Sequence, residues 1–200
     1  MLVLPTDFTP ASLPLNMSDG RGFVCVLRRL NRNDDAALLR FFRSHSKQTI
    51  LMRYGSLQIE MSPERAAQLV GVDQAHDAAL AFVEADEQGA HIIAVGRYIC
   101  ATDGVSAEMA FVVHENRRRR GLCSLLLKVL QGLARQQGVK ELFAQTQEDN
   151  FAMLGIFLKA GAIISIIEGT HAVDVRMPLD ALELPVLKPK RRLGFRRARG

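Results

Sequence analysis

Cysteine is scarce in this sequence and follows no recognisable pattern. The 200 residues include three cysteines, Cys25, Cys100 and Cys123, which are far apart in the chain. An odd number of cysteines without CxxC or Cys/His spacing is not the arrangement of a disulfide framework or of a structural zinc site. We therefore expect no metal centre and no structural disulfides.

Long hydrophobic runs and a leader sequence are also missing. No apolar stretch approaches the roughly 20 residues that a membrane-spanning helix needs. The first residues, MLVLPTDFTPASLPL, have neither a basic start nor an uninterrupted apolar stretch, so they do not resemble a secretory signal peptide. These absences predict a cytoplasmic protein without a membrane partner.

Acidic residues are absent from the last part of the chain. Residues 184–200 contain seven lysines and arginines and no acid, whereas the whole chain carries +5. The remainder is therefore slightly acidic, and the basic character belongs to this segment. Such a segment is typical of a solubilising end, or of a tail that binds an acidic protein, nucleic acid or anionic lipid. The sequence leaves these alternatives open.

Length and composition favour a single folded domain. A chain of 200 residues with 48% hydrophobic content can bury one core of ordinary size. We expect this domain at residues 22–180. Three prolines within residues 1–21 indicate an N-terminal extension with the character of a linker, and residues 181–200 form the basic, flexible tail.

Alternating periodicities predict a mixed α/β fold. A β-rich run at residues 22–29 is followed by two helices, the second opening at Ser62-Pro63 and ending at Gly71. The segment SKQTILMRYG between them has no periodicity, so we expect a loop or a short helical turn there. Three strands joined by short glycine-containing turns then form an antiparallel meander. The expected order is β-α-α-β-β-β-α-β-α-β-β, the last two strands forming a hairpin.

The helix after the meander has the strongest pattern in the sequence. Its apolar residues recur with spacings of three and four, which defines one continuous stripe: Leu122, Leu125, Leu126, Val129, Leu130 and Leu133. Gly138 is the expected end of this helix. We expect the stripe to pack against the sheet.

The loop that leads into this helix has the features of an anion site. It contains Arg118, Arg119 and Arg120, followed by Gly121. The first turn of a helix presents unpaired backbone N–H groups, and a glycine lets a phosphate approach the backbone closely. The loop has neither the GxxxxGK[ST] of a nucleotide P-loop nor the GxGxxG of a dinucleotide site. Taken alone, the arginine run is equally typical of a solvated face or a localisation patch.

This loop resembles the acetyl-CoA pyrophosphate loop of the GNAT superfamily, [Q/R]-x-x-G-x-[G/A]. Arg118, Gly121 and Cys123 occupy the three marked places, and Cys123 departs from the pattern because a thiol is larger than a hydrogen or a methyl group. The segment NFAMLGIFLKAGA, which begins at Asn150, is similar to the family's N-x-x-A-x-x-L-Y-x-K-x-G-F. The resemblance covers about residues 22–179 and implies the GNAT fold, a mixed and mostly antiparallel sheet flanked by helices.

Within the superfamily, the chain looks most like the catalytic domain of bacterial Pat-type protein lysine acetyltransferases. Three segments carry this resemblance in the same order: DDAALLRFFRSHSKQTILMRYG, SPERAAQLVGVD and AEMAFVVHE. Pat-type proteins commonly carry an added regulatory or acyl-CoA-synthetase-like domain, which these residues do not resemble. The resemblance implies acetyl-CoA as cosubstrate and a primary amine as acceptor.

Glu108 is the candidate catalytic base. It is the only acid in the apolar run from Val105 to Val113, and the period of two places it on one face with Ala110 and Val112. A lysine amine, with a pKa near 10.4, is protonated at neutral pH, so a base has to remove a proton before the amine can attack. The resemblance implies the same role, because Pat-type enzymes use a glutamate here. The alternative is a rim carboxylate paired with an arginine.

The resemblance also implies a set of cofactor contacts. The backbone of the strand before the loop would bind the pantetheine arm, and the loop with the first helical turn would bind the pyrophosphate. Asn150 would bind pantetheine or cap its helix. Phe157 replaces a tyrosine that protonates the leaving thiolate in many relatives, so it is a wall of the thioester pocket or plain core. The expected cofactor residues are Phe111, Val112, Val113, Arg118, Arg119, Arg120, Gly121, Leu122, Cys123, Ser124, Asn150 and Phe157.

Three functions are compatible with these features. The first is acylation of a protein lysine, the second is acylation of a small amine, and the third is a catalytically silent module that binds acyl-CoA. Glu108 favours the first two, whereas Phe157 favours the third. The basic tail suits an acidic protein partner better than a cationic polyamine. Whether the chain forms a homodimer is left open.

Overall fold

One eight-stranded sheet runs through the part of the chain that the structure describes. The structure is a computed structural model, and it describes residues 2–54, 60–87 and 89–179. Along the sheet the strands follow the order β1-β2-β3-β4-β5-β6-β8-β7, and every neighbouring pair is antiparallel except β5 and β6. The strands are β1 (Leu15–Ser18), β2 (Val24–Arg29), β3 (Ala78–Asp86), β4 (Gly89–Cys100), β5 (Ser106–Val113), β6 (Glu141–Gln147), β7 (Ile163–Ile166) and β8 (Ala172–Pro178).

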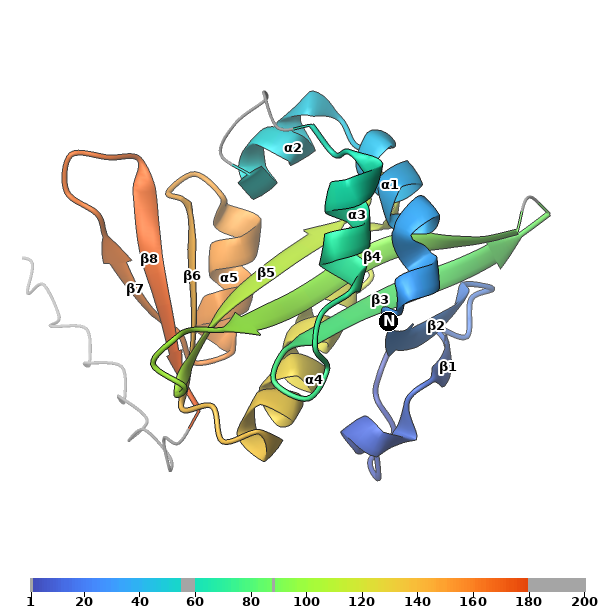
Figure 1. The fold of residues 1–200 in the computed structure, drawn as a ribbon, viewed down its shortest axis with the longest axis horizontal. Helices are drawn as coiled ribbons and strands as arrows, with labels where there is room; N and C mark the ends of the chain where they lie inside the picture. The colour runs from blue at the N-terminus through green and yellow to red at the C-terminus, as the bar shows by residue number, and fades with distance from the viewer. Residues whose placement is uncertain (1, 55–59, 88, 180–200) are drawn as a thin grey trace, which may run out of the picture.

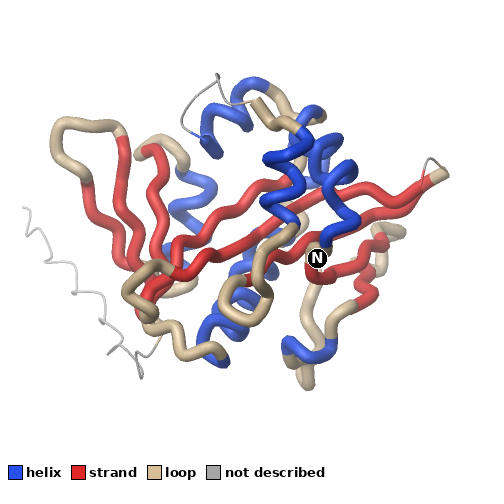
Figure 2. The backbone as a smooth tube through the Cα atoms, in the orientation of Figure 1, coloured by secondary structure: helices blue, strands red, loops and turns tan. Residues whose placement is uncertain are grey.

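Helices cover both faces of this sheet (Figure 1). On one face, called the α1 face below, lie α1 (Asp35–Arg43), α2 (Lys47–Tyr54) and α3 (Pro63–Val70). The other face, the α4 face, carries α4 (Leu122–Gln136) and α5 (Phe151–Lys159). Figure 2 shows the same three layers, with helices in blue on either side of the red strands. The mixed α/β fold class expected from the sequence is confirmed.

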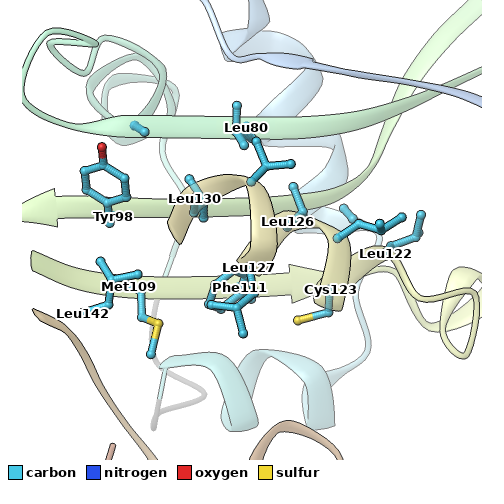
Figure 3. Packing of buried hydrophobic residues seen from close by; sticks show 14 of the residues in the cluster. Leu80, Tyr98, Met109, Phe111, Leu122, Cys123, Leu126, Leu127, Leu130 and Leu142 are labelled. Atoms are coloured by element: carbon cyan, nitrogen blue, oxygen red, sulfur yellow. The ribbon is translucent and has the colours of Figure 1, made fainter. Parts of the chain in front are cut away.

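The main core lies between α4 and the centre of the sheet. The apolar stripe of α4 is buried, and Leu126 and Leu130 pack against Leu80 of β3 and Phe111 of β5 in Figure 3. Each fully buried leucine contributes about 1.5–3 kcal/mol relative to an exposed one. Gly96 of β4 allows this close packing, because a Cβ there would lie 3.0 Å from the Phe111 ring and 3.1 Å from Leu126 Cβ.

The N-terminal residues differ from the linker that their prolines indicated. Residues 15–18 form the edge strand β1, which pairs with β2 from Leu15↔Leu27 to Ser18↔Val24. Leu2, Leu4 and Met17 are buried in the main core. The prolines are tolerated because they precede the edge strand, where a missing N–H breaks no interior ladder.

The helices α2 and α3 test two further predictions from the sequence. The segment without periodicity, expected as a loop or short turn, is the two-turn helix α2. Ser46 stabilises its first turn, since its Oγ accepts a hydrogen bond from the Thr49 N–H at 3.2 Å. α3 is confirmed as predicted, with the Ser62 Oγ accepting from the Arg65 N–H and Gly71 at its end. The basic tail lies outside the described residues.

Candidate active site

β5 and β6 separate partway along their length, and this split opens the site. Their parallel pairing runs from Ser106↔Glu141 to Glu108↔Phe143. Beyond it, β5 stays paired with β4 and β6 stays paired with β8, so each strand follows its own antiparallel partner. Figure 1 shows the two strands diverging toward α2.

The register of β5 determines which backbone groups face the split. The His114 N–H donates to the Ile93 carbonyl on β4 at 2.9 Å. Backbone groups of successive strand residues point to opposite sides, so those of Phe111 and Val113 face away from β4, toward the split. The backbone of Val112 faces β4. Backbone contacts to the pantetheine arm were expected from Phe111, Val112 and Val113. This geometry supports Phe111 and Val113, whereas Val112 can contribute only its side chain.

The split continues into a cavity of about 770 Å³. Its walls come from β5, β6, the arginine loop, the first turn of α4, α5 and one side of α2. Gly121 is the N-cap of α4 and adopts a φ of 83°, a left-handed conformation that favours glycine. The backbone N–H groups of Leu122, Cys123 and Ser124 therefore form the open end of a helix inside this wall.

Of the four arginines before Gly121, two contact described carboxylates and two do not. Arg117 Nε contacts Glu84 at 2.6 Å, and Arg120 lies 3.6 Å from Asp19 with its guanidinium 4.3 Å from the Phe23 ring centre. Arg117, Arg118 and Arg119 line the cavity, and of these Arg118 and Arg119 form no ion pair with a carboxylate among the described residues. The charge available to an anion is thus that of Arg118 and Arg119. The Arg120 side chain does not line the cavity.

Glu108 is the exposed carboxylate beside the end of the β5–β6 pairing. It lines the cavity from the α1 face, together with Ala110 and Val112, as its period of two predicted. The predicted alternative, an arginine partner, has no support, because Glu108 has no ion pair with any residue that the structure describes. Its carboxylate is therefore accessible to a group that enters the cavity from the α1 face.

The remaining predicted residues lie in the cavity wall and pack as structural residues at the same time. The Cys123 thiol is buried, which raises its pKa to about 12, and Sγ lies 3.5 Å from Met153 Sδ. Phe157 is 3% exposed, with its ring centre 6.2 Å from that of Phe111. Asn150 caps α5 by accepting from the Met153 N–H and donates to Thr146 Oγ at 2.9 Å. Asn150 is thus the helix cap and Phe157 a core residue, and both also line the cavity where the cofactor contacts were expected.

A cluster around Glu115 is a feature that the sequence analysis missed. Glu115 Oε1 accepts hydrogen bonds from the Ser46 N–H at 2.8 Å, from Ser46 Oγ at 2.7 Å and from Thr49 Oγ1 at 2.5 Å. Thr49 Oγ1 in turn accepts from Arg118 Nη2 at 2.6 Å. This chain of contacts ties α2 to the arginine loop. The serine in front of α2 was the one available signal, since serine is a common helix N-cap.

The cluster also shifts two pKa values. Burial raises the pKa of Glu115, but the hydrogen bonds from Thr49 and Ser46 outweigh burial and leave the pKa well below its usual range. Burial lowers the pKa of His45, and the neighbouring Glu115, 3.4 Å from Nδ1, offsets this only in part. The His45 Nε2 is buried without a hydrogen-bond partner in the described chain. His45 is thus a neutral core residue and Glu115 an anion at neutral pH.

Neither a metal site nor a membrane helix is present in the described part of the chain. No group of three or more histidine, cysteine, aspartate or glutamate side chains there is arranged to hold an ion. No helix there has both the length and the apolar character needed to cross a bilayer.

Comparisons with known proteins agree with this architecture. The GNAT domain of S. lividans PAT superposes with a TM-score of 0.69 at 22% identity, covering 78% of this chain and 92% of that one. yncA from Salmonella typhimurium, solved with its cofactor acetyl-CoA, gives a TM-score of 0.63 at 17% identity over 82% and 99%. A phosphinothricin acetyltransferase from Sinorhizobium meliloti, in complex with AcCoA, gives 0.61 at 14% identity over 77% and 88%. The model of the acetyltransferase (GNAT) family matches residues 40–162, and the chain therefore belongs to that family.

Proposed function

We propose that this protein transfers an acetyl group from acetyl-CoA to a primary amine, most readily the side chain of a protein lysine. The observation that carries the proposal is the cavity between β5 and β6, which joins an anion site at one end to an exposed carboxylate near the other. Arg118 and Arg119, which no described carboxylate pairs, supply positive charge at the N-terminus of α4. Glu108 lies at the end of the strand pairing.

The residues present fit acetyl-CoA along the whole cavity. The N–H groups of the first α4 turn, with Arg118 and Arg119, are suited to the pyrophosphate. The backbone groups of Phe111 and Val113 face the split, where an extended pantetheine arm can pair with them as a further strand would. The Phe157 ring and Ala110 form apolar walls nearer to Glu108. When bound, acetyl-CoA supplies the thioester whose carbonyl carbon the amine attacks.

Glu108 serves as the general base in this proposal. It takes one proton from the ammonium group, directly or through a water molecule, and passes that proton to solvent. The free amine nitrogen forms the amide bond as the carbon–sulfur bond breaks. The second proton of the nitrogen goes to the departing thiolate. Since a thiol has a pKa near 8.5, the thiolate is a tolerable leaving group, and Phe157 does not have to act as an acid.

The shape of the acceptor side favours a polypeptide over a small amine. Beyond the cavity wall at Glu108, the α1 face of β8 and β7 carries no described helix, whereas small-molecule sites are usually concave and largely enclosed. The Pat-type sequence resemblance points the same way. Acylation of a small amine is the second candidate, supported by the fold shared with the phosphinothricin enzyme.

The test is a Glu108→Gln variant. The amide is nearly isosteric but cannot take a proton, so turnover should fall by roughly 10²–10⁴-fold while acetyl-CoA affinity stays unchanged. Raising the pH should restore part of the rate, because free amine accumulates. Release of CoA with a panel of lysine peptides and small amines measures the rate, and calorimetry measures the affinity.

Glu168→Gln is the matched control, since it removes an exposed carboxylate in the turn between β7 and β8. This variant should retain the wild-type rate and pH profile. If Glu108→Gln also retains both, Glu108 is a structural rim residue. If the wild type binds acetyl-CoA but acylates no amine, the chain is a silent acyl-CoA-binding module instead.

A further inference from the structure

In the described part of the chain, helices cover only part of the α1 face near Glu108. α1 and α3 pack on β3 and β4, and α2 contacts β5 and β6, whereas β8 and β7 carry no described helix on this side in Figure 1. Across these strands the register places Glu108, Phe143, Arg176 and Ile163 in one row. Glu141 and Asp174 share the face, because residues two apart on a strand point the same way. We call these six residues the platform.

The platform has an excess of negative charge. Arg176 contacts Glu141 at 2.7 Å and Asp174 at 2.9 Å, so one guanidinium is shared by two carboxylates. Glu108 adds a third carboxylate at the edge nearest the cavity. Arg97, a nearby cation on the same face of β4, lines a separate cavity of about 40 Å³ beneath α1. A cationic polypeptide is therefore the complementary partner.

The described chain ends at the border of this platform. Pro178 pairs with Glu141, and the Leu179 N–H donates to the Lys140 carbonyl at 2.7 Å. Two strand spacings and a few residues along the strands place Glu108 about 15 Å from Leu179. Lys188 follows nine residues later in the sequence, enough chain to span about 30 Å. The basic tail is thus tethered within reach of the site.

We propose that the enzyme acetylates its own C-terminal segment, at Lys188 or Lys190. The proposal rests on the acetyl transfer proposed above and uses the same step. The lysine nitrogen gives one proton to Glu108, forms an amide with the acetyl carbon as the carbon–sulfur bond breaks, and its second proton goes to the thiolate of CoA. The tether makes the tail a local acceptor at a concentration on the order of millimolar, and platform charge holds it there.

The direct test is incubation of the full chain with acetyl-CoA, followed by peptide mapping with mass spectrometry. One acetyl group should appear on Lys188 or Lys190, with a first-order rate that is independent of protein concentration. The Lys188→Arg/Lys190→Arg double variant keeps the tail charge and should lose this modification. Glu108→Gln, which lacks the proposed base, gives the background rate. A rate that rises with protein concentration, or a tail modified no faster than this background, overturns the proposal.

A double variant and a control variant test whether the platform holds the tail. Glu141→Gln/Asp174→Asn removes two of the three carboxylates, so tail acetylation should slow by roughly threefold to tenfold and lose much of its salt dependence. Glu168→Gln removes a carboxylate outside the platform and should leave the rate unchanged. Equal effects of the two changes would show that the platform does not hold the tail.

A parallel assay separates this proposal from the proposed function. The same preparations are given an external lysine peptide, and release of CoA is followed. If the peptide is acetylated while the tail stays unmodified, self-acetylation is rejected and the proposed function stands. Binding of acetyl-CoA without transfer to either acceptor rejects the proposed function, and self-acetylation with it.

Discussion

At the scale of single residues, the arginine loop shows how neighbours of the same type acquire different roles. Arg117 and Arg120 are paired with Glu84 and Asp19, which lie on or beside the β2–β3 end of the sheet. Arg118 contacts the neutral hydroxyl of Thr49 and keeps its charge available. A run of four like charges is thus partly neutralised by the fold, and what remains lies at the N-terminus of α4.

Replacing Gly121 by glutamate should abolish acetyl-CoA binding. The side chain would bring negative charge and bulk to the open end of α4, where the pyrophosphate is expected to lie. Calorimetry measures the affinity. Because Gly121 has a φ of 83°, any side chain there also costs about 1–2 kcal/mol of strain.

A second glycine controls for that strain. Gly138 has a φ of 80°, lies beyond the opposite end of α4, and has open space where a Cβ would stand. Gly138→Glu should lose similar stability and keep acetyl-CoA affinity. Loss of binding in both variants would assign the effect to unfolding rather than to the pyrophosphate site.

Replacing Glu115 by glutamine should destabilise the protein in a pH-dependent way. Its carboxylate accepts three hydrogen bonds from Ser46 and Thr49, and the loss should cost roughly 1–3 kcal/mol at neutral pH. The folded-state pKa of Glu115 lies below its unfolded value, so this stability is complete above the unfolded pKa and disappears as the pH falls through the folded one.

Urea unfolding of wild type and Glu115→Gln at several pH values provides the measurement. The difference in unfolding free energy should be largest at neutral pH and shrink once the pH falls below about 4. A difference that stays constant across this range would show that the lost contacts do not depend on the charge of Glu115.

At the scale of elements, the contact between α4 and the sheet depends on a missing side chain. Gly96→Ala would place a Cβ 3.0 Å from the Phe111 ring and 3.1 Å from Leu126 Cβ. Because Leu126 belongs to the rigid helix, the two elements must separate slightly, and we expect a loss of about 1–3 kcal/mol. The midpoint of denaturant unfolding should fall accordingly.

At Gly132 within α4, replacement by alanine should have the opposite effect on stability. A Cβ there has its nearest neighbour, Pro10 Cγ, at 3.7 Å, which is ordinary contact. Gly132→Ala should therefore raise the stability by about 0.5–1 kcal/mol, because alanine favours the helix. If both alanine variants shift the midpoint in the same direction, close packing at Gly96 is not the cause.

At the scale of the whole molecule, we expect the cofactor site to be independent of the basic tail. All described residues that line the cavity precede residue 158, whereas the basic segment begins after the described chain ends. A chain truncated after residue 183 should bind acetyl-CoA with unchanged affinity, measured by calorimetry. A large loss of affinity would show that the tail completes the cofactor site.

Much of this organisation was predictable from sequence because it depends on local pattern. The leucine stripe determines α4, Ser62 and Asn150 mark the starts of α3 and α5, and the two motifs indicate the family that the family model confirms. Period two placed Glu108 on one face with Ala110 and Val112. Each of these inferences needs only residues that are neighbours along one element.

Only the tertiary structure decided which distant residues meet. Glu115 and Ser46 are 69 residues apart, and no local pattern predicts that one accepts hydrogen bonds from the other. The prolines of the N-terminal segment indicated a linker, so β1 was not predicted. The strand is stabilised by pairing with β2 and by burial of Met17, which no local pattern shows. The sequence determined which groups could bind an anion or take a proton, since these are properties of side chains. The fold determined which of those groups are left unpaired at the cavity, since pairing depends on contacts between elements.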